Sequence, residues 1–185
     1  MPSQLADELL LDVEDRMEKA IVALIHEFSN VRTGRANPSL LDRIVVNYYG
    51  VETPIKQISS VTIMEGSQLY IKPYDKNLLK EAEKAILSST LGLNPINDGV
   101  GLRLIIPQPT EQRRKELVKD VEKLGENGRI SIRNIRRDGN DKIKKMELIE
   151  DDLKGYLEDI QELTNNFIKK VDEEIKIKSD ELLKI

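Results

Sequence analysis

The sequence predicts an α+β protein, in which a long three-helix bundle carries a small inserted β/α/β domain. Apolar residues recur at helical spacing near the N-terminus and again in two segments of the C-terminal half. The middle of the chain instead alternates apolar and polar residues between turn signals, as strands do. A chain of 185 residues is long enough for two small domains that each bury a core.

The first segment is predicted to be a helix that begins at Ser3 and ends near Thr33 and Gly34. Ser3 is a residue type that caps helices, and Asn37-Pro38 forbids continuation beyond the end. One apolar stripe recurs at spacings of three and four residues. Its members are Leu5, Leu9, Val13, Met17, Ala20, Leu24, Phe28 and Val31.

The segment from about Leu41 to Pro107 is predicted to be a small α/β unit. The β-branched and aromatic run from Ile44 to Gly50 predicts a strand, because glycine closes it. Apolar residues alternate on both sides of Glu65-Gly66-Ser67, which predicts a hairpin. The remaining predicted elements are a short helix capped by Asp75 and ending before Gly92, a turn at 97–99 and a strand at 102–106.

Two further long helices are predicted in the C-terminal half, separated by a break near 149–152. Thr110 is the predicted N-cap of the first. At about 1.5 Å per residue, each helix would run about 50 Å. A helix this long with one narrow apolar stripe needs partners, so the three stripes predict a bundle. The stripes comprise Leu117, Val121, Leu124, Ile132, Ile135, Ile143 and Met146, then Leu153, Leu157, Ile160, Leu163, Phe167, Val171, Ile175 and Leu182.

The predicted domain boundaries follow from this order of elements. The bundle comprises residues 1–33 and 108–185, and the inserted domain comprises 34–107. Two connections therefore cross the boundary, near 33–35 and 107–109, and they contain Thr33, Gly34, Pro107 and Pro109. Glycine and proline at these places suggest a hinge, although proline at the start of a helix also serves as simple punctuation. The sequence leaves both interpretations open.

Glycines inside the second long helix are unexpected. Gly125, Gly128 and Gly139 each cost about 1 kcal/mol relative to alanine in a helix interior. Gly128 and Gly139 fall near the apolar stripe, where a missing side chain would admit a neighbouring helix closely. We favour the simpler interpretation, in which packing tolerates sequence drift at these positions.

Composition argues against an enzyme. The chain has no cysteine, and its one histidine lies off the apolar stripe of the first helix. It has no phosphate-binding loop and no metal-ligand spacing, so we expect no catalytic residue, metal, cofactor or small-molecule substrate. No apolar run is long enough to span a membrane and no signal peptide is evident, so the expected location is the cytoplasm.

Charge is segregated along the chain, although the total is only −4. Residues 129–145 hold seven basic and two acidic residues, a net charge of +5, whereas residues from 147 onward hold a net charge of −6. Arg129, Arg133 and Arg136 recur at i, i+4 and i+7 and project from one side of the helix, and Arg137 and Lys144 extend that side. Arginine suits bidentate contact with phosphate, which favours an RNA-binding face over an ion-paired surface face.

The partner expected for this face is folded RNA. Only 4% of residues are aromatic, so few side chains could stack on single-stranded bases, which favours recognition of RNA shape and phosphates. Arg32 and Arg35 flank Gly34 and would add to the surface if the junction folds beside it. The alternative is a coiled-coil or chaperone-like scaffold that binds proteins through the acidic third helix.

Five motifs occur along the chain in a characteristic order and spacing. They are VRTGRANPSLL (31–41), YYGVETP (48–54), LGLNP (91–95), PTEQRR (109–114) and IRNIRRD (132–138). Together they resemble one family, the bacterial ribosome recycling factors, over essentially the full length. Glycine at Gly125, Gly128 and Gly139 departs from the resemblance, since alanine is typical there, which puts the rigidity of that helix in question.

The resemblance implies an L-shaped arrangement of the two domains, joined by two hinge strands. It implies a monomeric translation factor that binds large-subunit rRNA at the subunit interface of the post-termination ribosome. Elongation factor G and GTP would then drive separation of the subunits. The arginines that match the family's rRNA contact are Arg129, Arg133 and Arg136, with Arg32 and Arg35 close by.

Overall fold

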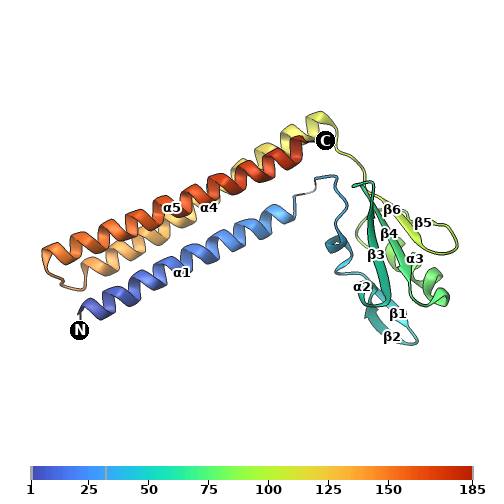
Figure 1. Ribbon diagram of the computed structural model, residues 1–185, viewed down its shortest axis with the longest axis horizontal. Coiled ribbons are helices and arrows are strands. Elements are labelled where there is room, and N and C mark those ends of the chain that lie inside the picture. Colours follow the sequence, from blue (N-terminus) through green and yellow to red (C-terminus); the bar gives the residue numbers. More distant parts are fainter. Residues whose placement is uncertain (1, 32, 185) are drawn as a thin grey trace. The chain divides into compact units, whose positions relative to one another are not determined.

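The computed structural model describes residues 2–31 and 33–184, which form two compact units (Figure 1). One unit combines 2–31 with 110–184 and consists of long helices. The other comprises 33–109 and contains the strands. The predicted α+β fold class, a long helical bundle with an inserted β/α/β domain, is confirmed.

The bundle is built from α1 (Pro2–Ser29), α4 (Glu111–Lys144) and α5 (Glu150–Leu183), which pack side by side (Figure 1). Each helix buries one stripe, and the stripes share a single core. With 34 residues each, α4 and α5 are about 51 Å long, as predicted. Core residues include Leu9, Val13, Met17, Leu24 and Phe28 of α1, Val121, Ile132 and Ile143 of α4, and Ile160, Phe167 and Val171 of α5.

The start of α1 differs from the prediction. The helix begins at Pro2, so Ser3 lies inside it and is not its cap. Proline suits a first turn, because its fixed φ is helical and its missing N–H has no intrahelical partner to lose. The buried stripe follows the prediction except at two positions: Ala6 is fully buried while Leu5 is 55% exposed, and Ile21 is buried while Ala20 is only partly buried.

The predicted cap of α4 is confirmed. Thr110 Oγ1 accepts a hydrogen bond of 3.1 Å from the backbone N–H of Arg113. Lys142 and Lys144 lie in the last turn, where positive charge is favoured at the C-terminus of a helix. The connection to α5 includes Glu147 with φ of 53°, a left-handed conformation that reverses the chain within a few residues.

Glycines of α4 have a packing role, and the interpretation as tolerated drift is wrong for Gly125 and Gly139. Both are buried on the face of α4 that meets the other helices. A Cβ at Gly139 would lie 2.8 Å from Val13 Cγ2 of α1, and one at Gly125 would overlap Ile175 of α5. Gly128 is less constrained, at 3.1 Å from Leu24 Cδ2. The missing side chains let branched residues of α1 and α5 approach the α4 backbone.

The strand-containing unit holds a four-stranded antiparallel sheet in the order β3-β4-β6-β5 and a separate two-stranded hairpin, β1-β2. The pairs β1-β2 and β3-β4 are local and joined by tight turns, whereas β6 joins β4 from a distant part of the sequence. The elements are η1 (Pro38–Leu41), β1 (Val45–Tyr48), β2 (Val51–Pro54), α2 (Ile55–Ile58), β3 (Ser59–Met64), β4 (Gln68–Pro73), η2 (Lys76–Leu78), α3 (Leu79–Leu87), β5 (Ile96–Asn97) and β6 (Leu102–Ile105).

The hairpin predicted around Gly66 is confirmed. Three residues, Glu65 to Ser67, connect the paired residues Met64 and Gln68, and the first two have left-handed φ of 53° and 71°. Asp75 accepts from the N–H of Asn77 and so caps the short 3-10 helix η2, whereas α3 itself begins at Leu79 with no side-chain cap. Strands β2 and β5 were not predicted. The core of this unit includes Leu41, Ile55, Leu69, Ile71, Ala82, Ile86, Leu102 and Leu104.

Candidate nucleic-acid interface

Four arginines of α4 form the candidate site, and we call Arg129, Arg133, Arg136 and Arg137 the arginine row. The first three are partly exposed and lie along the side of α4 that adjoins α5, while Arg137 is exposed. Ile132 and Ile135, between them in sequence, are buried in the bundle core. The helical repeat therefore places the isoleucines inside and the guanidinium groups at the surface, as the sequence predicted.

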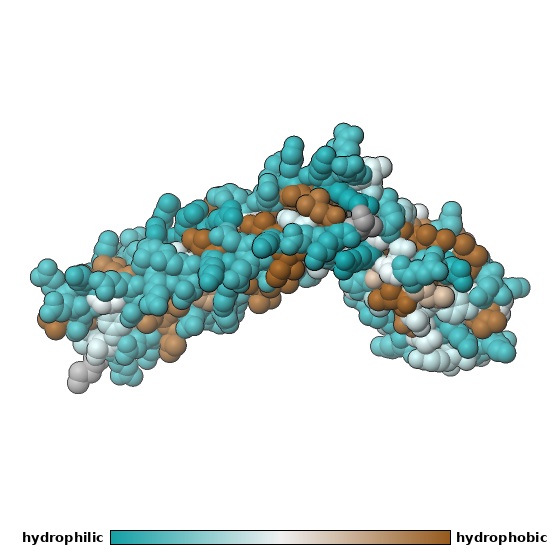
Figure 2. Space-filling model, turned by 45° about the horizontal axis from the view of Figure 1, so that its top comes forward, coloured by the Kyte–Doolittle hydropathy of each residue, from teal (hydrophilic) through white to brown (hydrophobic). Residues whose placement is uncertain are grey.

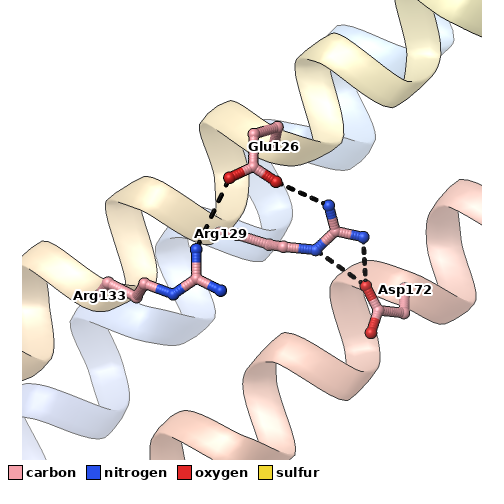
Figure 3. A network of polar contacts seen from close by, with 4 residues as sticks. All are labelled: Glu126, Arg129, Arg133 and Asp172. Carbon is pink, nitrogen blue, oxygen red and sulfur yellow. Dashed lines mark hydrogen bonds and ion pairs between the residues drawn. The ribbon is translucent and has the colours of Figure 1, made fainter.

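The first member of the row is held by two carboxylates of its own chain (Figure 3). Arg129 donates from Nε and Nη2 to Asp172 Oδ1 of α5, at 2.9 and 2.5 Å, and from Nη1 to Glu126 Oε2 of α4 at 2.9 Å. Its side chain is only 26% exposed. The hydrogen bond with Asp172 raises the pKa of Arg129, because the carboxylate stabilises the charged form. Arg129 therefore presents few free donors to a partner.

The next two members are less constrained. Arg133 is 42% exposed, and its Nη1 lies 3.6 Å from Glu126 Oε1, the second oxygen of the carboxylate that Arg129 uses (Figure 3). Arg136 donates from Nη1 to the amide oxygen of Gln161 on α5 at 3.1 Å. Its Nε is buried with no hydrogen-bond partner among the described atoms. Gln161 offers a neutral acceptor, so the charge of Arg136 is not cancelled by a neighbour.

The positive charge of α4 is concentrated towards its C-terminal end. Arg137, Lys144 and Lys145 are exposed, and within the described residues neither they nor Arg136 has a carboxylate within ion-pair distance. The predicted RNA-binding face is therefore ion-paired at Arg129, which contacts Asp172 and Glu126, and at Arg133, which contacts Glu126. The groups available to a phosphate backbone are mainly those of residues 136–145.

A carboxylate on another face of α4 fastens it to α1. Asp138 accepts from Arg16 Nη1 at 2.5 Å and lies 3.0 Å from Lys142 Nζ. These contacts, the one with Arg16 first, hold the pKa of Asp138 below its ordinary value. Asp138 is thus shared between Arg16 and Lys142, and this group of three keeps a net charge of +1. Within the described residues, Asp138 makes no ion pair with the arginine row. The bundle surface visible in Figure 2 is predominantly hydrophilic, with hydrophobic residues in separate patches.

The remaining predicted site residues belong to the other unit or fall outside the described residues. Arg35 is exposed, and Arg32 lies outside the described residues. Gly34 has φ of 79°, and a Cβ there would lie 2.7 Å from Pro109 Cδ. Gln108 Nε2 donates to the backbone oxygen of Gly34 at 2.7 Å. The connections at 33–35 and 107–109 are therefore tied to each other.

Sequence reasoning missed the residues that hold the arginine row. Glu126 was detectable, because a glutamate three residues before an arginine faces it on a helix. Asp172 and Gln161 were not, since their contact with α4 depends on the register between two helices. The described residues contain no group of three or more histidine or acidic side chains that could hold a metal ion. Among the described helices, none is both long and apolar enough to cross a membrane.

Comparisons with known proteins agree on one family. The family model for ribosome recycling factor matches residues 24–183. The ribosome-recycling factor of Acholeplasma laidlawii (strain PG-8A) is 58% identical over 180 residues, which cover 97% of this chain and 98% of that protein. A solution structure of the ribosome recycling factor aligns with a TM-score of 0.77 at 34% identity, covering 97% of this chain and 98% of the other.

A second solved structure shows a relative in a complex. It contains models for the T. thermophilus ribosome recycling factor and the E. coli elongation factor G bound to the E. coli post-termination complex. The recycling factor aligns with a TM-score of 0.61 at 43% identity, covering 96% of this chain and 98% of that chain.

Proposed function

The chain belongs to the ribosome recycling factor family, and from this premise we propose that it recycles ribosomes after termination. It binds large-subunit rRNA at the subunit interface and, with elongation factor G and GTP, splits the post-termination complex. It acts in the cytoplasm as a monomeric translation factor and not as an enzyme. The observation that carries this proposal is the 58% identity to a ribosome-recycling factor across 97% of the chain.

The arginine row supports contact with RNA through phosphates. Its members sit on a rigid helix, and Arg136 and Arg137, with Lys144 and Lys145 beyond them, leave donors facing outward. Phosphate contacts orient a protein on a nucleic acid without reading its bases, which suffices for one partner of fixed shape. We assign Arg129, Arg133, Arg136 and Arg137 to this contact, with Arg32 and Arg35 as further cations.

The two connections between the units support a hinge. Gly34 adopts a left-handed φ, and Pro107 and Pro109 restrict the backbone beside it. Because Gln108 bonds to Gly34, the two connections form one short element and not two independent linkers. We propose that Thr33, Gly34, Pro107 and Pro109 are the hinge through which force on one unit displaces the other. GTP hydrolysis on elongation factor G would supply the free energy.

The scaffold hypothesis finds less support. A helix partner needs a continuous apolar stripe, and the stripe of α5 is already buried against α1 and α4. The large apolar side chains that α5 exposes are Ile177 and Leu183. A protein-binding scaffold would also be insensitive to substitution of the arginine row.

Light scattering of post-termination complexes tests the proposal. Scattering should fall when the chain, elongation factor G and GTP are all present, because subunits scatter less than intact ribosomes. Omission of any one component should leave the signal unchanged. Unchanged scattering with all three components present would refute the proposed function.

A further inference from the structure

Two acidic residues give the two halves of the arginine row different net charges. Glu126 and Asp172 face Arg129 and Arg133, so this four-residue cluster carries no net charge. Glu126 bridges both arginines, with one oxygen for each (Figure 3). Further along, Arg136 meets the neutral Gln161. The N-terminal half of the row is therefore neutralised and the C-terminal half is cationic.

Neither carboxylate is part of the bundle core. Asp172 and Glu126 are 53% and 51% exposed, so either can be replaced without opening the core. Exposed ion pairs contribute little to folding stability. Their larger effect is on the field that an approaching polyanion meets, because nonspecific binding of nucleic acid is governed by the number of phosphates that the protein neutralises.

We infer that Asp172 and Glu126 determine specificity, by keeping the N-terminal half of the arginine row from binding RNA through charge alone. This inference rests on the proposed function and extends it. A partner of matching shape places a phosphate directly at Arg129, where it replaces Asp172, whose side chain is 53% exposed. An unrelated RNA, held only by charge, reaches the cationic half alone. Asp172 is thus a positioning residue that acts through Arg129.

The test compares Asp172→Asn with the wild-type chain in binding to a short RNA duplex of unrelated sequence. Anisotropy of a labelled duplex is measured between about 50 and 200 mM salt. Asp159→Asn is the matched control, because Asp159 is an exposed carboxylate of the same helix outside the network. Circular dichroism of each variant confirms that its helices are intact.

Freeing Arg129 should add one phosphate contact. The slope of log affinity against log salt should steepen by about 0.9, which makes the loss of affinity between 50 and 200 mM about 3.5-fold larger than in the wild type. The control should keep the wild-type slope. Adding Arg129→Gln to Asp172→Asn should remove the gain, since the effect passes through that guanidinium.

Three results would overturn the inference. Asp172→Asn could bind the duplex with wild-type affinity and slope, Asp159→Asn could show the same gain, or the gain could survive loss of Arg129. Binding of the wild-type chain to large ribosomal subunits is measured in parallel. Failure there would refute the proposed function, while the duplex measurements would still decide the role of Asp172.

Discussion

Replacing Gly139 by alanine should destabilise the bundle, although alanine is the better helix former. Gly139 lies inside α4, against the fully buried Val13 of α1. An added Cβ would lie 2.8 Å from Val13 Cγ2, closer than carbon atoms pack. Valine is branched at Cβ and enclosed by the core, so it has little freedom to move aside.

Gly155 provides the reference for this substitution. It also lies within a long helix, α5, but a Cβ there would meet nothing within 4 Å. Both substitutions gain about 1 kcal/mol of helix propensity, whereas only Gly139→Ala carries an overpacking cost of about 1–3 kcal/mol. The free energy of unfolding of Gly139→Ala should therefore be about 1–3 kcal/mol lower than that of Gly155→Ala. That of Gly155→Ala should be about 1 kcal/mol higher than that of the wild type.

Urea unfolding followed by circular dichroism at helical wavelengths measures this difference, because the bundle holds most of the helix. Midpoints are compared at equal m-values, so that a change in the denatured state is not mistaken for a change in stability. Equal stability of the two variants would refute the close-packing role of Gly139. Combining Gly139→Ala with Val13→Ala should cost less than the sum of the single changes, since the second removes the obstructing methyl.

Two further predictions concern the connections and the titration of the bundle. Gly34→Ala should slow subunit splitting more than it weakens ribosome binding, because a left-handed alanine costs about 1–2 kcal/mol and its Cβ would crowd Pro109. Gly50→Ala is the control, because Gly50 also has a left-handed φ, 86°, but open space around it, so that only the backbone cost applies. Equal splitting rates of the two variants would contradict the hinge. The hydroxyl of Tyr156 donates to Asp7 at 2.6 Å, which raises its pKa from 10.0 to about 12. Since the folded state favours the protonated form, this contribution to stability is present below pH 10 and is lost as the pH rises to about 12. The free energy of unfolding of Tyr156→Phe should therefore fall less than that of the wild type between pH 10 and 12. An equal fall in both proteins would exclude the hydrogen bond of Tyr156 as the cause.

The helices of the bundle were predictable because their signals are local. The spacing of apolar residues predicted which faces of α4 and α5 are buried, and Thr110 predicted the start of α4. The left-handed turn at Gly66 likewise follows from residue type. The first turns of α1 show the limit of this reasoning, since leucine at position 5 is more apolar than alanine at position 6, yet the alanine is the buried residue. Which of two adjacent residues is buried depends on the partner helices.

Features that depend on register between distant segments were not predictable. Strand β5 has two residues and no periodicity of its own, and exists only because it pairs with β6. The contact between Arg129 and Asp172 spans 43 positions of the sequence and depends on how α5 lies along α4. Arginine spacing predicted a cationic face, but only the packed bundle shows that its first member is neutralised.

The proposed function requires outward-facing cations of α4 to contact phosphates on the ribosome. Affinity for large ribosomal subunits, measured against salt for the wild type and for Arg136→Gln combined with Arg137→Gln, tests this claim. Loss of two phosphate contacts should make the log–log salt slope shallower by about 1.8 and weaken binding by about 1–3 kcal/mol per arginine. Lys19→Gln on α1, where the lysine pairs only with Asp15 among the described residues, should keep the wild-type slope. An unchanged slope in the double variant would contradict the proposed phosphate contacts of Arg136 and Arg137.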